Sequence, residues 1–301
     1  MRHSQASWAA AAGTVCISFS AIFVALAEVT PSTAAFWRGA YALPLLLVLR
    51  RFVVARDRRP TQVRAGALAA GTMLGVDLFL WHNSIARLGA GLATVAVHTQ
   101  VVFVGLLGWL LYRQLPTRRT LLFGTVIFTG VALISGLGRW DAFGAQPVSG
   151  TVFGILAGLS YAGFMLGLQA SNPAAAAPAA ATLLDATAGM VGASALIGVL
   201  TGELVLVPTW PAHGWLVALA VLCQVAGWTL LAFALPRLPA LSVSMIILAQ
   251  PMLAVVWGWL ILGETLSTIQ AAGVALVLVG LVAVNTQRSL VVTERPALEP
   301  A

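Results

Sequence analysis

Several ionisable residues lie inside long apolar stretches of this sequence, where each needs a chemical explanation. Arg38 and Asp77 lie in two early stretches, His98 lies near the middle of a third, and Asp185 lies in a later one. Ionisable side chains are costly inside a bilayer, and those that occur there mark binding sites, proton relays or ion pairs. These residues therefore have the chemistry to bind a charged solute, or to carry protons, within a membrane.

The composition indicates that lipid surrounds much of the molecule. Hydrophobic residues make up 60% of the chain and charged residues only 8%, whereas roughly a quarter of a soluble domain is charged. The net charge of +7 does not indicate nucleic-acid binding, because all sixteen basic residues are arginine and most flank apolar runs. Such basic flanks are an orientation signal in membrane proteins. We predict membrane lipids, and no nucleic acid, as partners.

Ten apolar runs are long enough to cross a bilayer, which takes about 20 residues of α-helix. They lack the two-residue alternation of membrane β-strands, so the sequence predicts an all-α integral membrane protein with ten transmembrane helices. The segment "NPAAAAPAAA" before the seventh run is compatible with a loop or a helix. The runs cover approximately residues 7–26, 33–50, 65–84, 89–112, 119–137, 150–169, 178–200, 213–234, 239–262 and 268–286.

The distribution of arginine predicts the orientation of these spans. An even number of spans places both termini on one side, and that side receives thirteen arginines, whereas the opposite side receives only Arg87 and Arg139. Positive loops remain inside, so we predict cytoplasmic N- and C-termini in the plasma (inner) membrane. The first run resembles a cleavable signal peptide, but its removal would leave nine spans and spoil the charge alternation. We therefore interpret it as a retained span.

The second half of the chain repeats the first. Residues 86–117 align without a gap on residues 236–267, and the same 150-residue offset brings Gly130 onto Gly280. Five spans per half is an odd number, so the second half must enter the membrane from the opposite side. The sequence thus predicts two inverted five-helix repeats, 1–140 and 141–288, followed by a cytoplasmic tail, 289–301. Inverted repeats recur in secondary transporters. The most informative matches are Arg87/Arg237, Gln100/Gln250 and Trp109/Trp259.

Three segments together resemble the EamA-type family of the drug/metabolite transporter superfamily: "FWRGAYALP", "LAQPMLAVVWGWLILGE" and "GVALVLVGLVAVN". The resemblance covers about residues 8–288. It departs from the family in the first half, where Gln114 stands opposite Glu264 of the second half. The resemblance implies export or exchange of small organic metabolites through a central cavity lined by spans 1–4 and 6–9. The fifth and tenth spans would support this cavity or contact a second subunit in a homodimer.

The candidate substrate-binding residues are polar or aromatic side chains in the spans assigned to the cavity. Arg38 either binds a substrate carboxylate or has a structural role, and His98 and the glutamines have the same two interpretations. Aromatic walls suit amphipathic solutes, and an amino acid would match both the aromatic rings and Arg38. Five other tryptophans, Trp8, Trp109, Trp140, Trp210 and Trp215, fit an interfacial belt better. The substrate-binding candidates are Trp37, Arg38, Trp81, His82, His98, Tyr161, Trp228 and Gln250.

Two further hypotheses concern protons and ion pairing. Asp77 is the first candidate for a proton-coupling group, with His98 as a second, because both lie at depths where burial can shift titration. Sliding the second span onto the seventh places Arg38 opposite Asp185. We hypothesise that these two residues form an ion pair that one conformational state breaks.

The sequence offers no signal for a catalytic site, a metal site or a cofactor. It lacks a phosphate-binding G-x-x-x-x-G-K-[ST] loop and a nucleophile elbow, and its two cysteines, Cys16 and Cys223, suit neither a disulfide framework nor a metal site. The leading interpretation is a secondary transporter, an exporter of small organic metabolites such as amino acids or amphipathic solutes. Two alternatives remain: an intramembrane enzyme acting on a lipid through Asp77 or His98, and a passive channel.

Overall fold

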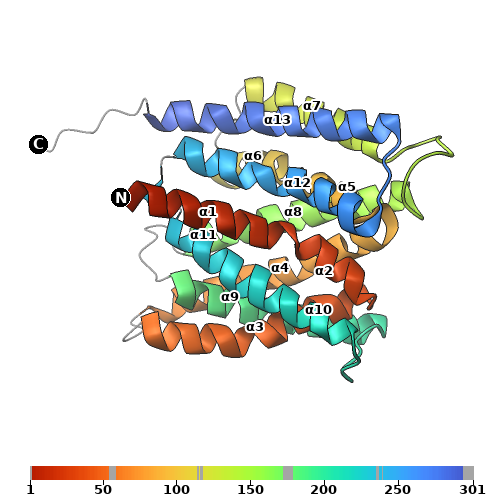
Figure 1. The fold of residues 1–301 in the computed structure, drawn as a ribbon. Helices are drawn as coiled ribbons and strands as arrows, with labels where there is room; N and C mark the ends of the chain where they lie inside the picture. Colours follow the sequence, from red (N-terminus) through yellow and green to blue (C-terminus); the bar gives the residue numbers. More distant parts are fainter. Residues whose placement is uncertain are drawn as a thin grey trace, which may run out of the picture.

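The chain folds into a bundle of helices that run side by side (Figure 1). The computed structural model describes residues 2–53, 59–113, 115, 118–171, 179–234, 237–238 and 240–293. Within these ranges the regular elements are helices and none is a strand. The predicted all-helical class is therefore confirmed.

The helices follow the ten predicted runs in order. Those of the first half are α1 (Arg2–Ser18), α2 (Ser20–Ala27), α3 (Pro31–Val53), α4 (Thr61–Leu88), α5 (Ala90–Val97), α6 (Gln100–Tyr112) and α7 (Arg118–Ile134). Those of the second half are α8 (Pro147–Ser171), α9 (Ala179–Thr201), α10 (Ala212–Ala218), the π-helix η1 (Leu219–Gly227), α11 (Trp228–Ala234), α12 (Ala240–Leu262) and α13 (Thr268–Thr293).

The bundle has two distinct ends. α1 begins and α13 ends at the same end, at the left of Figure 1, which we call the terminal end. The loops 135–146 and 202–211 lie at the opposite end, which we call the far end. Consequently α3 begins at the far end, whereas α4 and α9 begin at the terminal end.

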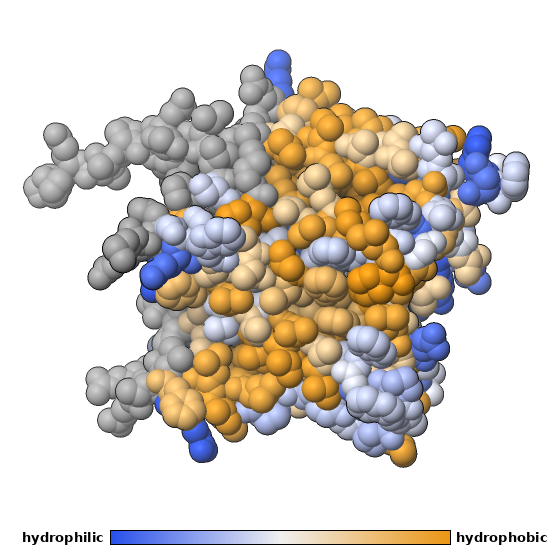
Figure 2. Space-filling view, viewed as in Figure 1, coloured by the Kyte–Doolittle hydropathy of each residue, from blue (hydrophilic) through white to orange (hydrophobic). Residues whose placement is uncertain are grey.

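The helices have the length and surface of membrane-crossing segments. Among the described residues, seven helical stretches are long and apolar enough to cross a membrane, and three shorter apolar helices accompany them. Figure 2 shows hydrophobic residues over most of the middle of one face, with hydrophilic residues gathered toward the two ends. An apolar middle between polar ends is the pattern expected of a bundle whose sides contact lipid.

Three of the helical stretches are locally irregular. The first breaks at Phe19, between α1 and α2, and the fourth breaks at His98 and Thr99, between α5 and α6. The eighth changes from α-helix to π-helix over Leu219–Gly227 and back again. Helix breaks and π-segments free or shift backbone groups inside a membrane bundle, and they occur often at functional sites.

The packing of the helices repeats between the two halves. α4 packs against α8 and α9, while the eighth stretch, α10–η1–α11, packs against α1, α2 and α3. α7 packs against α13, and α5 packs against α12. The third stretch thus contacts the sixth and seventh, and its equivalent, the eighth, contacts the first and second. This symmetry is expected for a chain whose halves share one architecture.

Glycines allow two of these helix pairs to touch by their backbones. A Cβ added at Gly71 would lie 2.0 Å from the carbonyl oxygen of Ala186, and one at Gly189 would lie 2.0 Å from that of Leu68. Gly71 and Gly75 of α4 therefore pack directly against α9. Between α7 and α13, a Cβ at Gly130 would lie 2.7 Å from the Gly273 carbonyl oxygen. Small residues at such crossings permit close helix packing in lipid.

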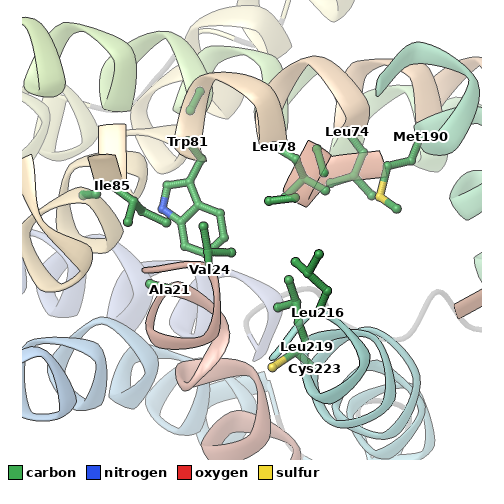
Figure 3. Packing of buried hydrophobic residues seen from close by; sticks show 14 of the residues in the cluster. Ala21, Val24, Leu74, Leu78, Trp81, Ile85, Met190, Leu216, Leu219 and Cys223 are labelled. Atoms are coloured by element: carbon green, nitrogen blue, oxygen red, sulfur yellow. The ribbon is translucent and has the colours of Figure 1, made fainter. Parts of the chain in front are cut away.

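The largest hydrophobic cluster lies where the two halves meet. Leu74, Leu78, Trp81 and Ile85 extend from α4, and Figure 3 shows them facing side chains of α2, α9, α10 and η1. The opposing residues include Ala21, Val24, Met190, Leu216, Leu219 and Cys223. This cluster surrounds the polar residues that make up the candidate site.

Candidate functional site

Arg38 is held by hydrogen bonds in the interior of the bundle. The side chain is only 5% exposed. Its Nε donates to Gln224 Oε1 at 2.8 Å, and its Nη1 donates to Ser20 Oγ at 2.8 Å. Gln224 Nε2 in turn donates to Thr187 Oγ1 at 3.3 Å. Arg38 on α3 is thereby connected to the first, seventh and eighth helical stretches.

Asp77 lies near Arg38 but does not pair with it. The charges of Asp77 and Arg38 lie close enough to influence each other and the Tyr161 hydroxyl. Among the described residues, however, no hydrogen bond or ion pair joins Asp77 to Arg38, and Asp77 Oδ1 has no hydrogen-bond partner. A buried carboxylate oxygen without a partner is energetically costly. The structure therefore brings together two opposite charges whose hydrogen-bonding capacity is incompletely used.

Trp81 and His82 are next to Asp77 on α4 and are also buried. Their rings lie 5.5 Å apart between centroids. His82 Nδ1 donates to the backbone oxygen of Pro31 at 3.1 Å, while His82 Nε2 and Trp81 Nε1 have no partner among the residues that the structure describes. His82 is 1% exposed, so it lies in the interior although its span ends only a few residues later.

A row of aromatic rings crosses the bundle beside this group. Phe19, at the break between α1 and α2, stacks on Trp257 at 4.8 Å and on Phe23 at 5.9 Å. Phe23 stacks on Trp215 at 6.1 Å. Trp257 Nε1 also donates to Ser18 Oγ at 3.0 Å. Trp215, which we predicted in an interfacial belt, is partly buried and packs against the central cluster.

The other four tryptophans predicted for the belt are more exposed than Trp215. Trp8, Trp109, Trp140 and Trp210 are 76%, 46%, 96% and 84% exposed, respectively. Trp37 on α3 is partly buried. Its Nε1 donates to the Val205 carbonyl oxygen at 3.0 Å, and its ring lies 4.9 Å from those of Tyr41 and His213. Trp37 therefore belongs to a cluster near the far end of the bundle.

The predicted ion pair between Arg38 and Asp185 is absent from this conformation. Asp185 instead pairs with Arg59 at 2.8 Å and approaches Arg64 at 3.9 Å. The reason is the inversion of the repeat. Arg38 is the eighth residue of a helix that begins at the far end, and Asp185 is the seventh of one that begins at the terminal end. Each lies roughly 10 Å from its own end, so equivalent positions occupy opposite depths.

Three predicted residues lie apart from the Arg38–Asp77 pair or have other contacts. His98 follows α5, and its Nδ1 donates to the backbone oxygen of Thr94 at 2.6 Å. Trp228 packs in a separate cluster around Ala10, Ile17 and Leu231. Gln250 is partly exposed and precedes Pro251 within α12. The structure does not bring these three side chains together with Asp77.

Gln224 is the main residue that sequence reasoning did not identify. It is 1% exposed and lies within the π-helix η1. An amide in the apolar run "AVLCQVAGW" is a signal that could have drawn attention to it. Trp257 was missed as well, although it lies in the repeated segment, where the first half has Leu107 at the equivalent position. In both cases the partner comes from a distant part of the chain.

Glu264 connects the second half to the first at the far end. Its carboxylate accepts hydrogen bonds from the backbone N–H groups of Ala90 and Gly91, which begin α5. Carboxylates are favoured at helix N-termini, where N–H groups lack partners within the helix. Burial raises the pKa of Glu264, and the two backbone N–H groups act in the opposite direction. Its predicted counterpart, Gln114, lies outside the described residues.

The same family model matches both halves of the chain. The model, described as the EamA-like transporter family, matches residues 5–136 and residues 148–286. The chain belongs to the EamA-like transporter family. This confirms the resemblance inferred from the sequence, and the family is part of the drug/metabolite transporter superfamily. Together with the apolar helices, membership shows a multi-pass membrane protein of a transporter family.

Comparison with solved structures supports the same fold. A protein described only as "Crystal structure of protein" superposes with a TM-score of 0.64 over 96% of this chain and 99% of that chain. The two sequences are 16% identical, so the similarity concerns the fold alone. No curated protein matches the chain in sequence.

Proposed function

We propose that this protein is a secondary transporter that exports small organic metabolites, such as amino acids, by alternating access. In this proposal ten helical spans form two inverted halves, 1–140 and 141–288. The terminal end faces the cytoplasm and the far end faces outward across the plasma membrane. The two matches of one family model and the repeated helix packing support this arrangement. The excess of arginine at the terminal end supports the orientation.

The observation that carries the proposal is that Arg38 and Asp77 lie near each other without forming an ion pair. Both are buried, at 5% and 4% exposure, and an ionisable group inside a membrane bundle normally pairs with another group or serves a transported solute. Arg38 presents a guanidinium fork that matches a carboxylate. Asp77 Oδ1 has no partner among the described residues and can accept a hydrogen bond from an ammonium group. An amino acid would satisfy both residues at once.

The neighbouring aromatic residues favour a solute with an apolar portion. Trp81 belongs to the hydrophobic cluster that includes the α4 side chains, and Tyr161 and Trp257 pack against that cluster, with Phe19 stacked on Trp257. Aromatic surfaces bind apolar groups and cations without requiring one particular shape. Amphipathic solutes therefore form the wider substrate class, with amino acids as its most specific member.

Asp77 is also the residue proposed to couple transport to protons. When protonated, Asp77 loses its charge and can donate a hydrogen bond, so its attraction for an ammonium group decreases. A proton moving inward could thereby exchange with a solute moving outward at one side chain. His98 stays a second candidate, because Nδ1 is bonded to Thr94 while its other ring nitrogen has no bond within the described residues.

Counterflow in proteoliposomes tests this function. Unlabelled leucine on the inside should accelerate entry of labelled leucine through a carrier, whereas it has no such effect on a passive channel. The recovered solute should be chemically unchanged, while an intramembrane enzyme would yield an altered product. Equal uptake with and without internal leucine would contradict alternating access.

A set of variants tests the assigned residues. Arg38→Ala should reduce leucine transport strongly, because the carboxylate loses its cationic partner. Asp77→Asn should abolish the effect of an imposed pH gradient and weaken leucine binding, because the neutral amide lacks the charge that attracts the ammonium group. Asp141→Asn is the matched control, because Asp141 pairs with Arg139 in an exposed loop. If Asp77→Asn responds to pH as the wild type does, the proton-coupling assignment is wrong.

A further inference from the structure

The eighth helical stretch contains an irregularity at the depth of the candidate site. The π-helix η1 extends over nine residues, Leu219–Gly227, between α10 and α11. π-helical hydrogen bonds join residues five apart, and such segments are short, rare and frequently found at functional sites. The polar side chain of this segment is Gln224, which is 1% exposed. The irregular turn therefore carries a buried amide into the centre of the bundle.

The orientation of the Gln224 amide follows from its two partners. Arginine offers only donors, so the group that faces Arg38 Nε must be the amide oxygen. The amide nitrogen then faces Thr187, whose hydroxyl accepts its hydrogen bond at 3.3 Å. Thr187 is 0% exposed on α9. Gln224 is thus held at both ends of its amide, and the amide cannot turn over without losing its hydrogen bond to Arg38.

These contacts also fix the guanidinium of Arg38. Nε is occupied by Gln224 and one N–H of Nη1 by Ser20, each at 2.8 Å. Nη2 makes no hydrogen bond to the part of the chain that the structure describes. A guanidinium carries five N–H groups in one plane. Holding the Nε edge therefore leaves Nη2 and the second N–H of Nη1 as a pair of donors with a defined direction.

We propose that Gln224 is a positioning residue that orients Arg38 for recognition of a substrate carboxylate. This inference rests on the proposed function and deepens it, because it assigns carboxylate selectivity to a residue that does not itself touch the solute. Without Gln224, the long arginine side chain regains rotational freedom, and binding must order it again. This entropic cost of ordering Arg38 applies only to solutes whose carboxylate binds the guanidinium donors.

The experiment measures transport of two probes that differ only in the carboxylate. Labelled leucine and labelled leucinamide are taken up by proteoliposomes that contain wild type, Gln224→Leu or Gln224→Met. The methionine variant keeps the length of the side chain and removes its hydrogen bonds. Thr229→Val is the matched control, because the hydroxyl of Thr229 is buried in the eighth stretch and has no partner among the described residues.

The expected result is a selective change in KM. Both Gln224 variants should raise the KM for leucine about tenfold or more, as for a lost hydrogen bond to a charged group. They should leave the KM for leucinamide and the maximal rates within about twofold of wild type. Thr229→Val should change none of these values. A merely structural role would not distinguish the two probes.

Several results would overturn the inference. One is an equal rise in KM for both probes, and another is a fall in maximal rate alone. A third is failure of both Gln224 variants to give monodisperse protein while Thr229→Val folds, which would assign Gln224 to stability. If wild type itself shows no counterflow of either probe, the proposed function fails together with the inference. Normal wild-type counterflow with unaltered Gln224 variants overturns the positioning role alone.

Discussion

Two helix contacts that are equivalent under the repeat are built in different ways. Near the terminal end, α4 crosses α9 with backbone against backbone at Gly71 and Gly189. Near the far end, the equivalent contact joins α3 to the eighth stretch through side chains. Tyr41 Oη and His213 Nδ1 are 2.6 Å apart there, and Arg38 bonds to Gln224. The 150-residue offset places Val221 opposite Gly71, and Val221 is 39% exposed.

The difference shows which contact can open by small movements. Backbone surfaces in contact can separate only if a whole helix moves, whereas side-chain hydrogen bonds can break when individual rotamers change. The terminal-end contact is further closed by the ion pair of Arg59 with Asp185. For the proposed transporter, this difference predicts that the far-end contact opens more readily than the terminal-end contact.

The largest expected effect comes from removing the ion pair at the terminal end. The Arg59 and Asp185 side chains are 5% and 11% exposed. Removing one partner of a buried ion pair costs about 3–5 kcal/mol. Asp185→Asn should lower the unfolding free energy of the detergent-solubilised protein by an amount of this order. It should also increase maleimide labelling of Met190→Cys from the terminal side, in a background with Cys16 and Cys223 replaced by alanine.

Asp141→Asn again provides the control for that experiment. Asp141 pairs with Arg139 at 2.8 Å, but in an exposed loop, where ion pairs contribute little to stability. This variant should unfold and label as the wild type does. If Asp185→Asn and Asp141→Asn behave alike, the ion pair does not close the terminal end.

The second effect tests the backbone contact itself. A Cβ at Gly71 would overlap the Ala186 backbone, so Gly71→Ala should destabilise the protein by about 1–3 kcal/mol. Gly192→Ala on α9 is the control, because an added Cβ there has nothing within 4 Å. It should be neutral or slightly stabilising, since alanine favours helix formation. Thermal unfolding in detergent measures both; equal changes would show that α4 and α9 do not cross this closely.

A smaller effect is expected at the far end. The hydrogen bond between Tyr41 and His213 should contribute about 0.5–1.5 kcal/mol. A double-mutant cycle with Tyr41→Phe and His213→Leu isolates this contribution from other effects of each substitution. Additive losses of stability would mean that the two side chains do not interact, and the far-end contact would then depend on Arg38 and Gln224 alone.

The smallest effect is expected at the contact of Glu264 with the first residues of α5, which both conformations of the proposed transporter can keep. The pKa of Glu264 is raised by burial, against the opposing effect of the Ala90 and Gly91 N–H groups. The folded protein therefore holds the proton more tightly than the unfolded chain. Stability should fall as pH rises from about 4.3 through the raised pKa. Glu264→Gln should remove this slope in unfolding measured at a series of pH values, and a slope unchanged in the variant would assign it to another group.

The helical bundle was predictable because its causes are local. Apolar runs of sufficient length specify the spans, and a glycine stripe such as that of Gly71 and Gly75 indicates close packing wherever it occurs. The burial of Arg38 and Asp77 could also be predicted, since both lie inside apolar runs. Each of these inferences depends only on a residue and its near neighbours along the chain.

The partners of the buried polar groups were not predictable in the same way. Gln224 bonds to Arg38, which lies 186 positions away in the sequence. Asp185 pairs with Arg59, which lies outside the predicted spans. The π-helix is a change in hydrogen-bond register, which leaves no distinct mark on composition or hydrophobic period. The repeat correctly identified equivalent positions, but inversion separates equivalents in depth unless they lie near the midplane.

The π-helix has a consequence for energetics as well as for geometry. η1 interrupts the eighth stretch, whereas its equivalent, α4, is an uninterrupted α-helix from Thr61 to Leu88. When two halves that differ in this way exchange roles, the two resulting conformations differ in free energy. A carrier built from them has unequal populations of its two orientations even without solute or gradient, so empty molecules accumulate on one side of the cycle. The backbone of a single helix would then favour the side of the membrane from which the empty carrier binds its solute.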